Sequence, residues 1–244
     1  MGHTTGKRHL RRISAPRTWP IPRKGSYWVV KPSPGPWRID LGMPLILWIR
    51  DYLKYAKTAR EVRYILVNKK VYLNGKPVKD PKFPAGLFDV ISFPDLGENY
   101  RVIMDSKGRL QLKLIDEKEA NLKITKIIRK QIVKKGKVQV TGFDGRNFLL
   151  DDPKSIKTGD SLLIGLPDQE IIEKIPMEEN TLLFFYYGAK VGTLGRLKEV
   201  KILRRPFGHT RIVIYEDLES REIKESIWEY TIPIGKETPV ITVK

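Results

Sequence analysis

The sequence predicts an α+β protein of several domains in which strands predominate. Its 244 residues exceed a typical domain of about 150 residues, and 41% of them are hydrophobic, enough for more than one core. Helical spacing of apolar residues is clear only in a short region that begins at Met43. From about Val102, short apolar runs alternate with turn residues, which is typical of a barrel or a sandwich.

Residues 1–42 are expected to form an extended arm. They contain six of the 17 prolines and three of the five tryptophans, without helical or strand periodicity. Proline blocks both kinds of hydrogen-bonded ladder. A disordered basic tail is the alternative, although such tails are usually poor in tryptophan. Because basic residues alternate with the tryptophans, we expect the arm to pack on its own protein or on bases while its cations contact phosphates.

A first helix is expected from Met43. Pro44 suits a first helical position, and Ile46, Ile49 and Leu53 recur at helical spacing. The apolar stripe is wide, so more than one neighbouring element should bury it.

A second helix is expected to open at Thr58. Thr58 and Glu61 have the spacing of a capping box, in which each side chain accepts from the other's backbone N–H. The positions facing inward are then Val62, Ile65 and Leu66.

The same helix should turn a basic face outward. Lys57, Arg60 and Arg63 follow one another at three-residue spacing, and Glu61 is the only acidic residue from Lys57 to Lys79. A merely solvated face would normally mix both signs of charge. We therefore interpret this face as a phosphate-binding surface, with simple solvation as the alternative.

A β-hairpin is expected at residues 71–78. Asn74-Gly75 lies between two apolar segments, and this dipeptide favours a type I′ turn. Two short helices and a hairpin make a compact unit of about sixty residues, which a strand region at 86–93 should complete.

The central region is expected to form short strands. Residues 120–133 fit neither the helical nor the strand period well, so both remain open there. The expected strands lie at 138–140, 148–150, 161–164 and 171–175, with turns at Asp144-Gly145, Asp152-Pro153, Thr158-Gly159-Asp160 and Leu166-Pro167-Asp168.

The last region contains glycines between apolar segments. Gly188, Gly192 and Gly195 are spaced by four and three residues, whereas a dinucleotide fingerprint needs two and three, so nucleotide binding is not expected. The glycines are expected to supply positive φ in the tight turns of a small barrel. The strands on either side of Phe207-Gly208 should continue that barrel.

The charge predicts a polyanionic partner. The chain has 46 basic and 28 acidic side chains, a formal net charge of +18. Such a surplus opposes compaction unless a polyanion such as nucleic acid neutralises it. The surplus is largest in residues 1–42, with nine basic side chains and one acidic, and smallest after residue 175, with eleven and ten.

Composition also excludes several kinds of site. The absence of cysteine removes disulfides, thiolate metal sites and thiol nucleophiles, and His3, His9 and His209 are too far apart in sequence for a histidine metal motif. No apolar run approaches the roughly 20 residues that span a bilayer. The basic N-terminus lacks the apolar segment of a signal peptide, so we expect an intracellular protein without cofactor or metal.

The acidic residues do not form a convincing catalytic group. Asp144 precedes a glycine and Asp152 precedes a proline, both ordinary turn positions, and Asp151 and Asp160 are further candidates. A carboxylate pair for acid/base or magnesium chemistry is the alternative. The run of Glu216, Asp217, Glu219 and Glu222 is interpreted as a solubilising surface.

In several motifs the chain resembles the small-subunit ribosomal protein family S4e of archaea and eukaryotes, essentially from end to end. Each motif is weak alone, but their order along the chain is specific. The motifs are His9-Leu10-Arg11-Arg12, Ala15-Pro16 with Trp19, Pro32-Ser33-Pro34-Gly35-Pro36, Leu53-Lys54-Tyr55-Ala56, Arg60-Glu61-Val62, Asn74-Gly75-Lys76, Pro84-Ala85-Gly86, Asp89-Val90-Ile91, Asp144-Gly145-Arg146, and Gly192 with Gly195-Arg196.

The resemblance implies four parts. These are a basic Pro/Trp-rich arm at 1–42, an alpha-L RNA-binding domain at 43–105, the family's own β-rich domain at 106–175, and a KOW-type barrel with C-terminal strands at 176–244. Together with the charge pattern it points to the following RNA-binding residues: Lys7, Arg8, Arg11, Arg12, Arg17, Arg23, Lys24, Lys57, Arg60, Arg63, Lys69, Lys70, Lys76, Arg146, Lys190, Arg196, Arg204 and Arg205.

The implied function is structural. A family member of this kind binds and orders small-subunit ribosomal RNA in the cytoplasmic ribosome, beside neighbouring ribosomal proteins, with no catalysis, small-molecule substrate, cofactor or membrane. Two alternatives are a transcription or RNA-processing factor, since KOW and alpha-L domains also occur there, and an RNA-modifying enzyme such as a pseudouridine synthase. The enzyme would need a large catalytic domain, which two small β modules do not provide.

Overall fold

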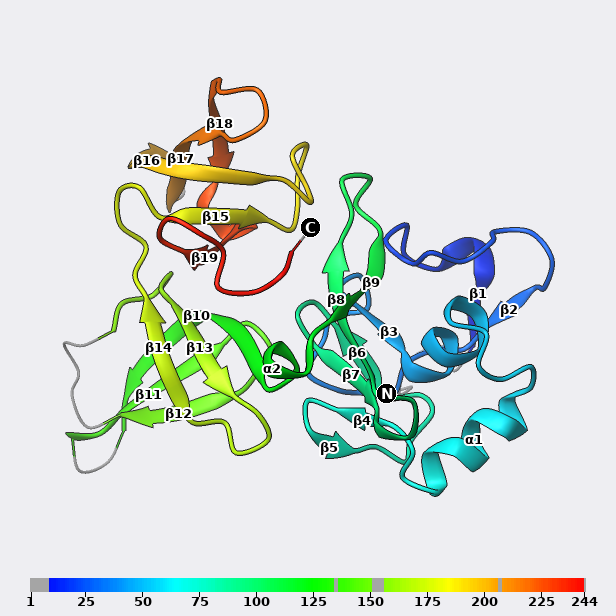
Figure 1. Ribbon diagram of the computed structural model, residues 1–244. Coiled ribbons are helices and arrows are strands. Elements are labelled where there is room, and N and C mark those ends of the chain that lie inside the picture. Colours follow the sequence, from blue (N-terminus) through cyan, green and yellow to red (C-terminus); the bar gives the residue numbers. More distant parts are fainter. Residues whose placement is uncertain (1–8, 134–135, 151–155, 206–207, 244) are drawn as a thin grey trace, which may run out of the picture. The chain divides into compact units, whose positions relative to one another are not determined.

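The computed structural model describes residues 9–133, 136–150, 156–205 and 208–243, apart from the side chain of Arg205. They form two compact units, and Figure 1 shows the course of the chain. The first unit comprises the residues up to 102 together with 109–116, and the second comprises 103–108 together with the chain from 117 onward. Strands predominate in an α+β fold, as predicted. Across the described residues, no helix has the length and apolar character needed to span a bilayer.

The described part of the arm, residues 9–42, packs on its own unit. Contrary to the prediction it contains two short strands, β1 (Leu10–Arg11) and β2 (Trp28–Val29), which pair antiparallel at positions without proline, and a 3₁₀ turn η1 (Arg12–Ser14). Trp19 is 2% exposed, and its indole N–H donates to the carbonyls of Ile39 and Gly42. Two of the three arm tryptophans are thus anchors, since Trp37 is buried as well.

Asp89 fixes the arm to the rest of the first unit. This carboxylate is 1% exposed and accepts from the Trp37 indole N–H at 2.6 Å and from the Gly86 backbone N–H at 2.8 Å. The Asn74 amide donates to its other oxygen at 2.8 Å. Several donors of this kind stabilise a buried carboxylate. Through them Asp89 connects the arm, the hairpin at Asn74 and the strand that ends at Gly86.

The first helix differs from the prediction at its start. Pro44 does not open it but ends strand β3 (Gly42–Pro44), which pairs with β6 (Pro84–Gly86). The helix starts at Leu45, whose N–H donates to the Phe83 carbonyl, and continues as the π-helical segment η2 (Leu47–Tyr52). The sheet pairing therefore overrides the local preference of proline for a first helical turn.

The second helix and the hairpin form as predicted. Helix α1 (Ala59–Val67) has the capping box of Thr58 and Glu61. On its inner face, Val62 and Leu66 are buried and Ile65 is half-buried. Asn74 and Gly75 have φ values of 52° and 75°, as a type I′ turn requires.

A five-stranded sheet, in the order β5-β4-β7-β8-β9, completes the first unit. Only its last strand, β9, lies beyond residue 105, where the sequence analysis placed a boundary. Its strands are β4 (Tyr72–Leu73), β5 (Lys76–Pro77), β7 (Val90–Phe93), β8 (Glu98–Met104) and β9 (Leu110–Ile115), and the 3₁₀ turn η3 (Pro94–Leu96) joins β7 to β8.

The second unit contains two five-stranded antiparallel sheets. The first, in the order β12-β11-β10-β13-β14, follows the short helix α2 (Glu117–Ala120) and encloses a core that includes Ile127, Val140 and Phe148. Its strands are β10 (Leu122–Ile132), β11 (Val138–Gly142), β12 (Asn147–Leu150), β13 (Ser161–Gly165) and β14 (Ile171–Ile175). Residues 120–133, left open by the sequence, are therefore mainly strand.

The second sheet of this unit has the order β18-β17-β16-β15-β19 around a core that includes Phe185, Leu197 and Tyr215. Gly188 and Gly192 have positive φ, as expected, whereas Gly195 lies in a strand where an added Cβ would be 2.3 Å from the Tyr215 ring. The elements are β15 (Leu182–Phe185), β16 (Leu194–Arg205), β17 (Gly208–Asp217), β18 (Ile223–Ile227), the 3₁₀ turn η5 (Trp228–Tyr230) and β19 (Thr231–Gly235).

Lys126 joins the two sheets of the second unit. It is 2% exposed, and its ammonium donates to the carbonyls of Trp228 and Thr231 at 2.8 and 2.6 Å and lies 4.0 Å from the centre of the Trp228 ring. Burial lowers the pKa of Lys126 to about 7, Glu229 opposes this shift and Arg211 adds to it.

The stability of the second unit is therefore expected to rise between about pH 7 and pH 10 through Lys126. In this range the unfolded chain holds a proton on Lys126 that the folded chain does not, because the folded pKa of about 7 is below the ordinary 10.5. Chemical denaturation of the wild type and of Lys126→Met at pH 6, 7.5 and 9 measures this, with the exposed Lys201→Met as control. The wild type should gain stability relative to Lys126→Met as the pH rises; parallel curves would contradict this.

Candidate nucleic-acid interface

Helix α1 presents the basic face that the sequence predicted. Lys57, Arg60 and Arg63 are all exposed, while Val62 and Leu66 on the opposite side are fully buried. Packing thus fixes the helix orientation and leaves the cationic side chains in solvent. Lys69, which follows α1, and Lys76 in the hairpin are also exposed.

The single carboxylate of this face, that of Glu61, accepts hydrogen bonds from backbone N–H groups. Glu61 accepts from the N–H of Lys57 at 2.7 Å and from the N–H of Thr58 at 3.4 Å. The hydrogen bond from the Lys57 backbone is the main reason why the pKa of Glu61 lies below its ordinary value. Glu61 therefore caps the N-terminus of α1 with its charge, and Lys57, Arg60 and Arg63 set three positive charges against it.

Two features near α1 were not predicted. Lys70 forms an ion pair with Asp95 at 2.9 Å, which raises the pKa of Lys70 and offsets part of its charge. Tyr64 is 69% exposed on the helix, one turn after Arg60. Its exposed ring lies on the same helix as the cations, and its position four residues after Arg60 was the available sequence signal.

Two arginines of the arm that were predicted to bind RNA form hydrogen bonds to the arm's own backbone. The guanidinium of Arg23 donates to the carbonyls of Ala15 and Pro16 at 2.6 and 2.9 Å, and Arg12 donates to Pro22 at 2.9 Å. Arg11, Arg17 and Lys24 are exposed, whereas Lys7 and Arg8 lie outside the described residues. The arm thus uses part of its positive charge to hold its proline-rich backbone.

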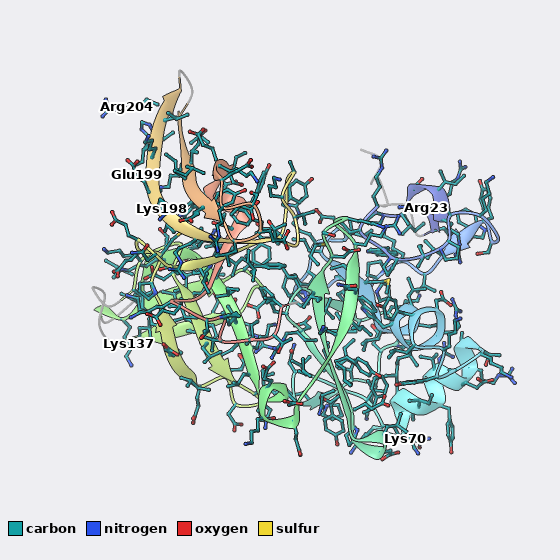
Figure 2. All side chains as sticks on the ribbon, turned by 45° about the horizontal axis from the view of Figure 1, so that its top comes forward. Arg23, Lys70, Lys137, Lys198, Glu199 and Arg204 are labelled. Atoms are coloured by element: carbon teal, nitrogen blue, oxygen red, sulfur yellow. The ribbon has the colours of Figure 1, made fainter. Side chains whose placement is uncertain are left out.

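In the second unit the predicted cations are dispersed. Lys190 is exposed in the turn before β16, Arg196 is half-buried on β16, and Arg204 is exposed at the far end of that strand (Figure 2). The side chain of Arg205 lies outside the described residues. Lys198 on the same strand is paired with Glu216 at 2.8 Å. These positions do not gather into one surface comparable to that of α1.

Arg146 belongs to a buried charge cluster. Its Nε lies 3.2 Å from Asp144, and the ammonium of Lys123 lies 2.7 Å from the same carboxylate. Burial would raise the pKa of Asp144, but Lys123 and Arg146 together hold it below its ordinary value. Asp144 therefore compensates two cations, one of them 1% exposed.

The other acidic candidates also have structural roles. Asp160 accepts from the backbone N–H of Lys157 and of Met177 and pairs with Lys174 at 3.2 Å. Asp217 was expected at the surface, but it is 4% exposed. The turn that follows it brings Ser220 and Lys224 close, and both donate hydrogen bonds to its carboxylate. Asp151 and Asp152 lie outside the described residues.

Tyr55 has a strongly perturbed pKa and forms a surface cluster with Glu98 and Tyr100. Tyr55 donates to Glu98 and contacts the Tyr100 hydroxyl at 2.9 Å. Desolvation, followed by the bond to Glu98, raises the pKa of Tyr55, while the tyrosine bonds lower the pKa of Glu98. A general acid or base works best with a pKa near the operating pH, and these shifts lead away from it. Among the described residues, no cluster of three or more His, Asp or Glu side chains has the arrangement of a metal site.

A capped helix with an exposed basic face, a basic arm and a strand-rich body together define a nucleic-acid-binding protein. Comparison with known proteins identifies the family. The family model described as Ribosomal family S4e matches residues 96–171, the RS4NT domain matches 4–40 and the S4 domain matches 43–91.

Relatives that match most or all of the chain agree with these matches. The small ribosomal subunit protein eS4 of Korarchaeum cryptofilum is 42% identical over 100% of both chains, and that of Nanoarchaeum equitans is 50% identical over 80% of this chain and 82% of its own. The crystal structure of the 30S ribosomal protein S4e from Thermoplasma acidophilum is 33% identical, with a TM-score of 0.67 over 80% of this chain and 96% of that chain. The chain belongs to the ribosomal protein family S4e.

Proposed function

We propose that the chain binds and orders small-subunit ribosomal RNA mainly through phosphate and shape contacts, with the basic face of α1 as the central contact. As a member of family S4e it is a structural constituent of the small ribosomal subunit, takes part in translation and is not an enzyme. The observation that carries the RNA contact is the set of exposed cations on α1, whose one carboxylate is bound by backbone.

The mechanism is electrostatic. Cations that neutralise phosphates release condensed counterions, and this release favours binding. RNA helices hide their base edges in a deep groove, so a rigid helix recognises backbone and shape. The further proposed phosphate contacts are Arg11, Arg17, Lys24, Lys69, Lys76, Lys190, Arg196 and Arg204. Arg12, Arg23, Lys70 and Arg146 are expected to act mainly by holding the arm, the α1 region and the second unit in shape, because their charges face protein oxygens.

We further propose the division into 1–42, 43–105, 106–175 and 176–244, with a KOW-type barrel in the last part. The two five-stranded sheets of the second unit support the boundary between 106–175 and 176–244, since their strands lie at 122–175 and 182–235. The proposed location is the cytoplasmic ribosome, and the proposed partners include neighbouring small-subunit proteins.

Sedimentation of the tagged protein tests this function. A cell lysate is fractionated on sucrose gradients at moderate and high salt, and the protein is quantified against small-subunit ribosomal RNA. We expect co-migration with the small subunit at a ratio near one to one. Migration at the top of both gradients would contradict the proposal and favour a free RNA-processing or transcription factor.

A further inference from the structure

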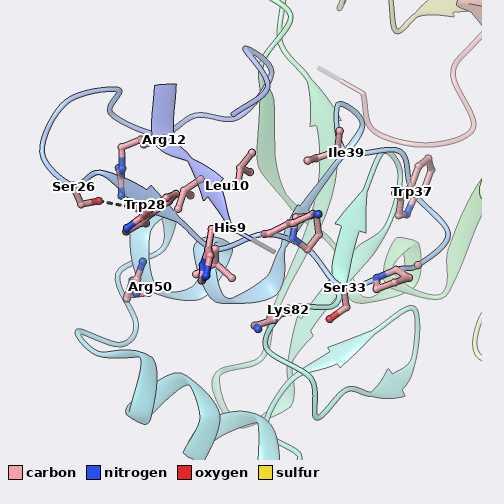
Figure 3. A pocket seen from close by; sticks show the side chains of 16 residues that line it. His9, Leu10, Arg12, Ser26, Trp28, Ser33, Trp37, Ile39, Arg50 and Lys82 are labelled. Atoms are coloured by element: carbon pink, nitrogen blue, oxygen red, sulfur yellow. Dashed lines mark hydrogen bonds between the residues drawn. The ribbon is translucent and has the colours of Figure 1, made fainter. Parts of the chain in front are cut away.

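The first unit contains an open groove beside the arm, with a volume of about 960 Å³ (Figure 3). Its basic lining side chains are His9, Arg12, Lys31, Arg50 and Lys82, and none of the described residues that line it is acidic. Asp51 pairs with Arg50 at 2.6 Å and offsets part of its charge, and the Arg12 guanidinium donates to the Pro22 carbonyl. The volume is in the range of about 300–1,000 Å³ that is usual for ligand sites, and the charge favours an anion.

An exposed tryptophan lies in this groove. Trp28 is 51% exposed, whereas Trp19 and Trp37 of the same arm are buried. The centre of its ring lies 4.6 Å from that of Tyr27, which it meets edge-on, and 5.3 Å from that of His9. Pairing of β2 with β1 fixes the Trp28 backbone, so an indole surface is held in place beside cationic side chains.

An aromatic ring beside cations in a concave site fits one class of polyanion. Unpaired nucleotides can stack their bases on aromatic side chains while their phosphates meet basic residues. Paired bases are stacked within their helix and cannot reach such a site. An acidic peptide would satisfy the charge without using the indole face.

We propose that this groove binds an unpaired stretch of ribosomal RNA, with one base stacked on Trp28 and the adjacent phosphates near Lys31 and Lys82. The proposal rests on the proposed RNA-binding function and gives the arm a different ligand from α1. Helix α1 contacts the backbone of folded RNA, whereas the groove takes bases that lie outside a helix.

Binding of short RNA to the full chain tests the groove. Fluorescence anisotropy compares a labelled single-stranded hexauridylate with the same strand carrying abasic central nucleotides. Stacking of one base on an aromatic ring predicts at least about fivefold tighter binding of the base-bearing strand. This comparison needs no substitution, so equal affinity for the two strands would overturn the proposal.

Variants then locate the effect. Trp28→Ala should remove the preference and Trp28→Phe should keep most of it. Tyr187→Ala is the matched control, because Tyr187 is 47% exposed and has an aromatic neighbour, Tyr230, at 4.9 Å. Preference retained in Trp28→Ala, or binding of an acidic peptide at this site in place of RNA, would overturn the assignment. Co-migration with the small subunit is measured separately, so failure of the groove and failure of the proposed function are distinguishable.

Discussion

Replacing Asp144 by asparagine is expected to destabilise the second unit by about 3–5 kcal/mol, the range for removal of one partner from a buried ion pair. Asp144 is 3% exposed and lies 2.7 Å from the ammonium of Lys123. Thr125 donates to its other oxygen at 2.9 Å. Asparagine keeps the shape but removes the negative charge that balances Lys123 and Arg146.

Acid should remove the same stabilisation from the wild type. The folded pKa of Asp144 is below its ordinary value, so its contribution is present above the unfolded pKa and is lost as the pH falls through the folded pKa. Urea denaturation at pH 7 and at lower pH measures both effects. The difference between wild type and Asp144→Asn should be largest at pH 7 and should shrink on acidification.

Two further variants separate charge from local disruption. Asp168→Asn, at an exposed turn of the same unit, should change stability by no more than about 0.5 kcal/mol. Adding Lys123→Met to Asp144→Asn should recover much of the loss, because the buried cation is then absent. A loss below about 1 kcal/mol in Asp144→Asn, or no recovery in the double variant, would contradict this role.

The features predicted correctly from sequence depend on short-range hydrogen bonds. Thr58 and Glu61 close the cap of α1 within four residues, and Asn74-Gly75 closes its own turn. In both cases the relevant side chains and backbone groups are neighbours in sequence. The exposed cations on α1 follow for the same reason, since the cap and the buried Val62 fix which face is outward.

The features that sequence did not settle depend on distant partners. Residues 123–127 are all buried, two of them lysines, so neither a helical nor a strand period is visible. Lys123 is compensated by Asp144, and Lys126 by carbonyls at 228 and 231. The sequence predicted Pro44 in a helix, whereas it ends a strand. Its strand partner, Pro84, lies forty residues further along the chain, so the local sequence does not reveal the pairing.

The candidate site shows the same division. The type of residue and its exposure on α1 were predictable, but the engagement of Arg23 with arm carbonyls was not. The groove was missed as well, because it combines Trp28 of the arm with Arg50 and Lys82 from much later positions. Only the folded chain brings these side chains together.

Removal of two charges from α1 is expected to weaken RNA binding and its dependence on salt. For Arg60→Ala combined with Arg63→Ala, the slope of log affinity against log salt should flatten by about 1–2, since each neutralised phosphate contributes roughly 0.7–0.9. Both side chains are exposed and alanine favours a helix, so the fold should persist. Thermal unfolding checks that the variant is as stable as the wild type.

The salt dependence of binding to small-subunit ribosomal RNA tests the central claim most directly. The matched control is Arg109→Ala combined with Lys113→Ala, which removes the same charge from two exposed positions, one just before β9 and one within it. The predicted result is a slope that flattens by about 1–2 in the α1 variant and by less than about 0.5 in the control. An unchanged slope in the α1 variant, or equal flattening in both, would show that α1 is not the phosphate-binding face.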